Sequence, residues 1–291
     1  MGKIVITAAT GQLGGLVVKH LLELGIPAQN IAAAVRNEEK AAGLKKLGLE
    51  IRRGDYDQPA TLREAFRDAD KLLFISGSSN DGSLRIRQHA SVAEAARDAK
   101  VGQIVYTSLA FADEVMLGME NVHLATEWAI KETHLPYTIL RNPFYIDLVL
   151  NPLVRGAVAT GVIASASKGG KMNFVTRSDL ALAAAKVLAT DGHQNKVYEL
   201  ANPQPYTFDQ FAAILSEVSG KEIKHRDGTP EQAREQLIKQ GLPAETTGFY
   251  TFIWRCVELG YFGLASADLS HLIGSKFTSV KEDVQNVLRG L

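Results

Sequence analysis

Short apolar runs alternate with longer amphipathic segments through the first half of the chain. Residues 4–6 read Ile-Val-Ile, a β-branched run typical of a parallel strand that is covered on both faces. After a turn of small residues, leucine and valine recur at helical spacing from Leu13 to Leu24. The alternation continues and predicts further strands at 31–35, 49–53, 71–76, 103–107 and 137–140. It predicts helices at about 37–47, from 57 through 66, at 84–99 and at 120–134.

This order predicts an α/β fold of the Rossmann type, a doubly wound parallel sheet with helices on both faces. In such a sheet, ligands bind beyond the carboxyl ends of the strands. We therefore expect the site among the residues that directly follow each strand: Ala8, Ala9, Thr10, Gly11, Gln12, Leu13, Arg36, Asp55, Tyr56, Ser76, Gly77, Ser78, Ser108, Leu109, Arg141, Asn142, Pro143, Phe144 and Tyr145.

The pattern is less regular after residue 145. It indicates a helix at 144–158 that Pro152 interrupts, a polar loop at 165–171, an amphipathic helix at 177–190 and a returning strand at 197–201. Thr207 and Thr229 each begin a helix with glutamine three residues later, as in a capping box. We expect one domain of residues 1–145 plus about 172–201, and a smaller C-terminal α/β lobe of about 146–171 and 202–291.

The segment from Ala8 to Gly14 has the glycine spacing of a dinucleotide-binding loop, with Ala8 in place of the first glycine. Its small residues allow a ligand to lie against the backbone. The N-terminus of the helix that follows would offer N–H groups and a positive dipole end to a pyrophosphate.

Arg36 ends the second strand, where NAD-specific folds usually carry Asp or Glu for the ribose hydroxyls. A guanidinium there would instead pair with a 2′-phosphate and favour NADPH. Lys40, one helical turn later, would add a second positive charge. The alternative is that both are solvated surface residues.

Four other strand-end residues have candidate cofactor roles. Asp55 would accept a hydrogen bond from the adenine amino group, or cap the following turn. Tyr56 would pack on the adenine, or fill the edge of the core. Ser76 and Gly77 would let the chain pass close to the ribose or pyrophosphate, or form an ordinary turn.

The helix at 120–134 lacks the tyrosine and lysine, four residues apart, that short-chain dehydrogenases use for proton transfer to a carbonyl. It carries His123 and Glu127 on one face instead. They would hydrogen-bond one another and direct the imidazole at a substrate, or be an exposed pair of little consequence. The absence disfavours alcohol–ketone interconversion. It is compatible with hydride delivery to an acceptor that stabilises the resulting charge itself.

Composition narrows the class of protein. The 291 residues carry 32 basic and 32 acidic side chains, a balance that argues against a dedicated nucleic-acid surface. No apolar run is long enough to span a membrane, and the first strand leaves no room for a signal peptide. Cys256 is the single cysteine, which we interpret as a buried small hydrophobe rather than a nucleophile. These features favour a cytoplasmic protein. No histidine shows metal-ligand spacing, so we predict no metal.

Aromatic side chains concentrate in residues 249–262. This segment would roof a pocket for a flat apolar substrate, or pack in the core or in a homodimer.

Taken with these motifs, the chain resembles the NmrA-like, atypical short-chain dehydrogenase/reductase family over nearly its whole length. The resemblance is strongest in Ala8–Gly14, Val35-Arg-Asn37, Gly54-Asp-Tyr56, Leu72-Leu-Phe-Ile-Ser76, His123-Leu-Ala-Thr-Glu127 and Leu140-Arg-Asn142. Within the family, the chain looks most like bacterial triphenylmethane reductases and type 2 NAD(P)H:quinone oxidoreductases. That implies an NADPH-binding Rossmann domain, a small C-terminal lobe and a substrate cleft between them. The implied cofactor contacts are Thr10, Gln12, Leu13, Arg36, Ser76, Gly77, Arg141, Asn142 and Tyr145.

We expect an NADPH-dependent reductase that delivers hydride to a flat conjugated acceptor, a quinone or triphenylmethane dye. The nicotinamide should lie near Ser108, with His123, Asn142 and Glu127 as candidate catalytic residues. The alternatives are a non-catalytic NADP(H)-sensing regulator of the NmrA type and a specialised carbonyl or imine reductase.

Overall fold

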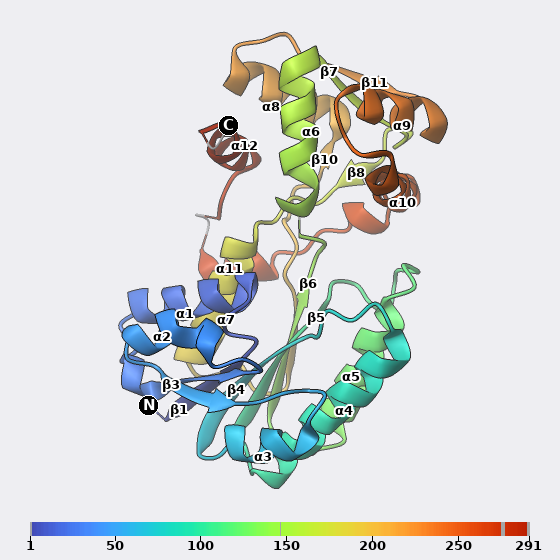
Figure 1. The fold of residues 1–291 in the computed structure, drawn as a ribbon. Helices are drawn as coiled ribbons and strands as arrows, with labels where there is room; N and C mark the ends of the chain where they lie inside the picture. Colours follow the sequence, from blue (N-terminus) through green and yellow to red (C-terminus); the bar gives the residue numbers. More distant parts are fainter. Residues whose placement is uncertain (1, 146, 275–276, 290–291) are drawn as a thin grey trace. The chain divides into compact units, whose positions relative to one another are not determined.

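The computed structural model describes residues 2–145, 147–274 and 277–289, and these form two compact units (Figure 1). The first unit comprises Met1–Asn142, Arg177–Leu200 and His271–Ile273. The second comprises Pro143–Thr176, Ala201–Ser270 and Gly274–Leu291.

The first unit is built on a seven-stranded parallel sheet with the strand order β3-β2-β1-β4-β5-β6-β9. The strands are β1 (Lys3–Thr7), β2 (Ile31–Val35), β3 (Glu50–Arg53), β4 (Ala69–Ile75), β5 (Gln103–Leu109), β6 (Tyr137–Asn142) and β9 (Lys196–Glu199). Every residue of β2 and β5 is buried, as expected for strands covered on both faces. The predicted Rossmann-type α/β fold is confirmed.

Helices cover both faces of this sheet (Figure 1). On one face lie α1 (Gln12–Glu23), α2 (Ala42–Lys46) and α7 (Arg177–Ala189), with α1 packed against α7. On the other lie α3 (Leu62–Ala65), α4 (Gly82–Asp98) and α5 (Glu120–Lys131). Phe66, Phe74 and Tyr106 form the centre of the core under this second layer.

Two of the predicted helices are much shorter than expected. The segment 37–47 forms a 3₁₀ turn, η2 (Glu39–Ala41), followed by the five residues of α2. Asn37 Oδ1 accepts hydrogen bonds from the backbone N–H groups of Glu39 and Lys40, which stabilises the turn. The segment after 57 likewise divides into η3 (Pro59–Thr61) and α3.

The second unit combines helices with two small sheets. Its helices are α6 (Asp147–Thr160), α8 (Phe208–Ser219), α9 (Pro230–Lys239), α10 (Thr247–Glu258) and α12 (Val280–Arg289), with the turns η4 (Ala244–Thr246) and η5 (Tyr261–Gly263). Strand β7 (Val162–Ser165) pairs in parallel with β11 (Lys224–Asp227), and β8 (Lys171–Met172) pairs antiparallel with β10 (Tyr206–Thr207). Helix α11 (Asp268–Ile273) has residues in both units.

Both capping boxes, at Thr207 and Thr229, are confirmed. The expected helix at 144–158 begins at Asp147, and residue 146 lies outside the described residues. The short strands β7, β8, β10 and β11 were not predicted. They are two to four residues long, and β11 reads Lys-His-Arg-Asp, which carries no apolar alternation.

Candidate active site

A cavity of about 950 Å³ lies at the carboxyl ends of β1, β2, β3 and β4 in the first unit. Nine residues expected from the strand ends line it, together with the predicted Lys40: Ala8, Thr10, Gly11, Arg36, Asp55, Tyr56, Ser76, Gly77 and Ser78. Strand order alone brings these segments together, because parallel strands end at the same edge of the sheet. Sequence reasoning missed Leu84 and Gln88, which α4 adds to the lining.

The turn after β1 is shaped by close backbone contacts. A Cβ atom on Gly14 would lie 2.4 Å from the Ala8 carbonyl oxygen, so only glycine fits there. Gly11 N donates to the same oxygen at 2.9 Å and caps α1 without a side-chain hydrogen bond. A helix N-terminus without a side-chain cap suits a phosphate group.

Ala8 itself has φ = 49°, in the left-handed region that favours glycine. The backbone of this turn therefore suits glycine better than alanine at position 8. The methyl group of Ala8 is exposed. The left-handed backbone conformation ordinarily costs an L-residue about 1–2 kcal/mol.

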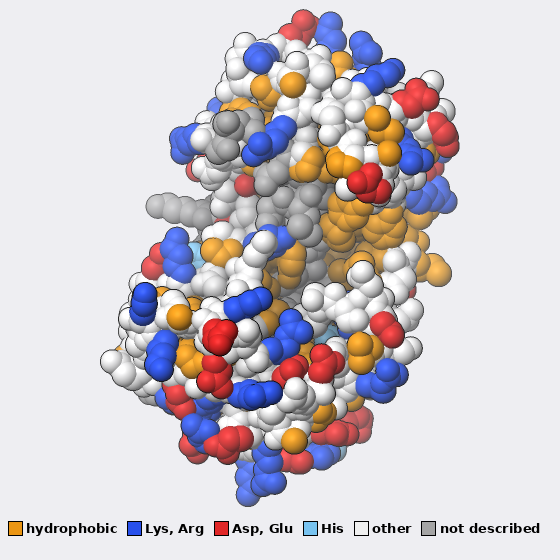
Figure 2. Space-filling view, in the orientation of Figure 1, with side chains coloured by type: hydrophobic (Ala, Val, Ile, Leu, Met, Phe, Trp, Pro, Cys, Tyr) orange, Lys and Arg blue, Asp and Glu red, His pale blue; other side chains and the backbone are white. Residues whose placement is uncertain are grey.

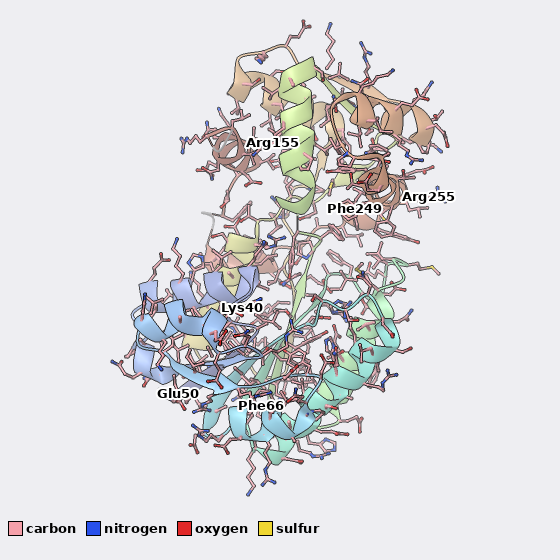
Figure 3. The ribbon with its side chains drawn as sticks, viewed as in Figure 1. Lys40, Glu50, Phe66, Arg155, Phe249 and Arg255 are labelled. Atoms are coloured by element: carbon pink, nitrogen blue, oxygen red, sulfur yellow. The ribbon has the colours of Figure 1, made fainter. Side chains whose placement is uncertain are left out.

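Two cations lie at the β2 end of the cavity. Arg36 directly follows β2, and Lys40 lies on η2. Both side chains line the cavity and are exposed, and neither forms an ion pair with another residue in the described part of the chain. Figure 2 shows lysine and arginine side chains on this face of the first unit, where Figure 3 labels Lys40. The arrangement suits a phosphomonoester such as the 2′-phosphate of NADPH.

Tyr56 and Asp55 have structural partners as well as places in the cavity wall. The Tyr56 hydroxyl lies 2.7 Å from Thr7 Oγ1 and 2.8 Å from the Ile75 carbonyl oxygen, so it links the ends of β1 and β4. Asp55 Oδ1 accepts from the Asp57 N–H at 3.1 Å and shapes the turn. Contact with adenine stays a prediction for both residues.

Gly77 is held from behind the cavity by a buried histidine. His89, on α4, has no exposed surface, and its Nε2 accepts from the Gly77 N–H at 2.9 Å. Its Nδ1 therefore carries the proton and donates to Thr126 Oγ1, 2.8 Å away, while that hydroxyl donates to the Val122 carbonyl. Burial, and next the charge of Arg85, lowers the pKa of His89 to about 3. The imidazole is therefore neutral, which leaves Nε2 able to accept.

The predicted partnership of His123 with Glu127 is wrong. His123 Nδ1 lies 3.0 Å from the Tyr106 hydroxyl, and burial lowers the pKa of His123 to about 3. Its exposed fraction is 8% and that of Glu127 is 2%, so the alternative of an exposed pair is also wrong. Both side chains point into the layer between α5 and the sheet, where tertiary partners replace the helical neighbour.

Glu127 instead forms a bidentate ion pair with Arg141 of β6. Its two oxygens accept from Arg141 Nε and Nη2 at 2.9 and 3.0 Å, and Ser108 Oγ donates to it at 2.6 Å. Arg141 Nη1 also donates to Glu199 and Asp113. Burial lowers the pKa of Arg141, but Glu127 and Glu199 outweigh it and raise that pKa above its usual value. The predicted roles of these residues in cofactor contact or catalysis remain predictions.

The other predicted site residues lie outside the cavity lining. Gln12 Oε1 accepts from Arg177 at the start of α7, and Leu13 is buried on α1. Asn142 is the buried last residue of β6. Pro143, Phe144 and Tyr145 belong to the second unit, where the Phe144 ring stacks on Phe262 with centroids 5.4 Å apart. Their contact with a cofactor also stays a prediction.

The aromatic segment 249–262 forms α10 and η5 of the second unit. Tyr250 and Trp254 are buried in the core, whereas Phe249, labelled in Figure 3, is 38% exposed. Figure 2 shows hydrophobic side chains gathered around α10. Cys256 is buried, and burial raises the pKa of its thiol to about 11, which confirms the interpretation as a structural residue.

No group of three or more His, Cys, Asp or Glu side chains among the described residues is arranged to hold a metal ion. No helix in this part of the chain combines the length and apolar character that crossing a membrane requires.

The cavity therefore has the features that a dinucleotide requires. Its lining includes the cations Arg36 and Lys40 after β2, the turn before the N-terminus of α1, and the small residues that follow β4. The family model described as NAD(P)H-binding matches residues 8–191, which begin at Ala8 of this turn. The chain belongs to the NAD(P)H-binding family. Several oxidoreductases are similar to this chain over nearly its whole length.

Quinone oxidoreductase 2 from Escherichia coli is 37% identical over 98% of both chains, and its structure with NADPH superposes with a TM-score of 0.88. Triphenylmethane reductase from Citrobacter sp. is 48% identical over 99% of both chains, with a TM-score of 0.93, and has also been solved with NADP(H). An NmrA-like oxidoreductase from Aspergillus flavus is 30% identical over 97% of this chain and 94% of its own length. The predicted NmrA-like family, the NAD(P)H cofactor and the oxidoreductase class are confirmed.

Proposed function

We propose that this protein is an NADPH-dependent reductase that delivers hydride directly to a flat conjugated acceptor, a quinone or a triphenylmethane dye. The observation that carries the proposal is the pairing of Arg36 and Lys40 with the glycine turn across one cavity. Nearly full-length similarity to a quinone oxidoreductase and to a triphenylmethane reductase supports the acceptor class.

In this proposal the first unit binds the cofactor. Arg36 and Lys40 hold the 2′-phosphate, the N-terminus of α1 holds the pyrophosphate, and Ser76 with Gly77 carries the chain toward the nicotinamide ribose. The exposed Phe249 and the neighbouring Phe144 are the side chains we assign to a flat acceptor. Ser108, His123 and Asn142 remain the candidates beside the nicotinamide.

The proposed chemistry follows from the absence of a Tyr/Lys proton-donor pair on α5. Bound NADPH supplies a hydride, and a quinone or a dye cation delocalises the electrons it receives. The protein therefore needs to supply proximity, orientation and exclusion of water, rather than a Tyr/Lys proton donor. A neutral His123 fits this role because it can donate or accept a hydrogen bond without adding charge.

The test mixes purified full-length protein with NADPH and a panel of quinones and cationic dyes, and follows NADPH absorbance. We expect turnover with at least one of the two classes, and a higher kcat/KM with NADPH than with NADH. Tight NADPH binding without turnover across the panel would instead support an NADP(H)-sensing regulator.

A homodimer and a cytoplasmic location are parts of the same proposal. The half-exposed apolar surface around α10 supports self-association, and a single cysteine suits a reducing compartment. Light scattering of the purified protein and fractionation of its native cells test the two points.

A further inference from the structure

Arg85 places a cation beside the cavity without a carboxylate partner. It lies on α4, and its Nη2 donates to Ser76 Oγ at 2.8 Å. Its Nε is buried and has no hydrogen-bond partner among the described residues, and no described carboxylate forms an ion pair with it. A half-buried guanidinium with an unsatisfied N–H is unfavourable unless an anionic group completes its surroundings.

The groups around Arg85 do not compensate this charge. His89 and His123 both have their pKa lowered to about 3, by burial first and by Arg85 second. Tyr106, which also interacts with Arg85, has its pKa raised by burial and is neutral as well. His89, His123 and Tyr106 are therefore uncharged near neutral pH. The carboxylate of Glu127 on α5 is paired with Arg141 and not with Arg85.

Through its contact with Ser76, Arg85 lies beside the half of the sheet that would hold the nicotinamide. A dinucleotide fold has two halves, which meet where the strand order reverses. Here that point lies between β1 and β4. Arg36 follows β2, so the adenosine half is formed by β1, β2 and β3. Ser76, which Arg85 contacts, follows β4 and belongs to the other half.

From these observations we propose that Arg85 stabilises the negative charge that develops on the oxygen of a quinone acceptor, and that the enzyme consequently prefers neutral quinones to cationic dyes. This proposal rests on the function proposed above and specifies its substrate class. Arg85 lies outside every set of site residues expected from the sequence, because it is on a helix face rather than at a strand end.

The two acceptor classes change charge in opposite ways. When a quinone is reduced, the nicotinamide C–H bond breaks with both electrons passing to the quinone, and an O–H bond forms at one oxygen. The other oxygen becomes a phenolate until it takes a proton from water, which gives the hydroquinone and NADP⁺. A fixed guanidinium favours that developing anion.

A triphenylmethane dye begins as a cation. Its central carbon forms the new C–H bond, and the product is neutral. A nearby guanidinium repels the dye cation and gains nothing from the neutral product. Removal of the Arg85 charge should therefore have opposite effects on the two classes of acceptor.

The experiment compares wild type with Arg85→Gln, Arg85→Lys and the control Arg87→Gln, all as full-length protein. Arg87 is an exposed arginine on the same helix, two residues away. For each protein, kcat/KM is measured with a neutral naphthoquinone and with a cationic triphenylmethane dye. The Kd for NADPH is measured separately by its fluorescence, and the melting temperature reports folding.

We expect Arg85→Gln to lower kcat/KM for the quinone by about 10- to 100-fold and to leave dye reduction unchanged or faster. Arg85→Lys should retain most of the quinone activity, and Arg87→Gln should change neither. The proposal is overturned if both acceptors lose activity equally, or if the main change is a weaker Kd for NADPH, which would make Arg85 a cofactor contact. If wild type reduces neither class, the proposed function itself fails; if wild type reduces quinones and Arg85→Gln does so equally well, only this proposal fails.

Discussion

The imidazole of His89 holds the backbone N–H of Gly77 at 2.9 Å, across twelve residues of sequence. Gly77 lines the cavity, whereas His89 lies behind it with no exposed surface. The hydrogen bond therefore fixes the position of a cavity wall from inside the core. A Cβ on Gly77 would approach His89 Nε2 to 3.3 Å, so the packing on this side is already tight.

We expect His89→Ala to weaken NADPH binding, because the freed N–H of Gly77 would be left without its acceptor and the wall would shift. A loss of about 1–3 kcal/mol corresponds to roughly 5- to 150-fold in Kd. His89→Gln should restore part of the affinity, since its side-chain oxygen can accept the same hydrogen bond. Fluorescence titration with NADPH measures the affinity. Equal affinity for wild type and His89→Ala, at unchanged melting temperature, would contradict this positioning role.

Stability should fall as the pH is lowered, because two histidines are buried in the neutral form. The pKa values of His89 and His123 are lowered to about 3 in the fold, chiefly by burial, from an ordinary value of 6.5. Below pH 6.5 the unfolded chain binds protons that the folded chain does not. The stabilisation is therefore complete above pH 6.5 and is lost progressively as the pH falls toward 3. Each histidine contributes up to about 1.4 kcal/mol per pH unit.

Urea denaturation at pH 7, 6, 5 and 4 measures this dependence. The variant His123→Gln should show a shallower decline between pH 6 and pH 4 than wild type does. An unchanged slope would mean that His123 titrates normally in the fold.

Arg36→Glu should change the cofactor preference. Loss of a charge-assisted contact to the 2′-phosphate costs about 1.5–3 kcal/mol, and the new carboxylate adds repulsion. We expect kcat/KM for NADPH to fall at least about 100-fold, while the value for NADH changes little. The matched control is Arg63→Glu, an exposed arginine on α3 that does not line the cavity. Equal losses with the two cofactors would show that Arg36 does not contact the phosphate.

Substitution of Glu127 distinguishes a structural role of this residue from a catalytic one. Its carboxylate accepts from Arg141 and Ser108 inside the fold, so Glu127→Gln removes a charge from a buried network. We expect a loss of about 2 kcal/mol in the free energy of unfolding, with kcat at 25 °C nearly unchanged. Urea denaturation and steady-state kinetics measure the two quantities. A large loss of kcat at full stability would restore the catalytic interpretation.

Much of this site could be predicted from the order of apolar runs alone. Ala8, Arg36 and Ser76 meet in one cavity because each follows a buried parallel strand, and such ends are easily located in the sequence. The contacts of His89 and Arg85 could not be predicted, since they depend on how α4 is rotated over the sheet. The pairing of Glu127 with Arg141 was missed for a related reason. Helical spacing suggested His123 as the partner, but a buried carboxylate is better satisfied by a guanidinium on the adjacent strand.

Ala8 provides the test of how far the dinucleotide turn tolerates a side chain. Its φ of 49° is strained for alanine, and glycine would adopt it freely. We expect Ala8→Gly to stabilise the protein by about 0.5–1 kcal/mol, after allowance for the greater entropy of glycine in the unfolded chain. The control is Ala9→Gly, at a fully buried neighbour whose φ is not positive, which should destabilise the protein instead. Urea denaturation compares the two variants.

If Ala8→Gly also tightens NADPH binding, the methyl group obstructs the pyrophosphate. If only stability rises, the strain is confined to the backbone. A loss of stability in Ala8→Gly would contradict the strained conformation.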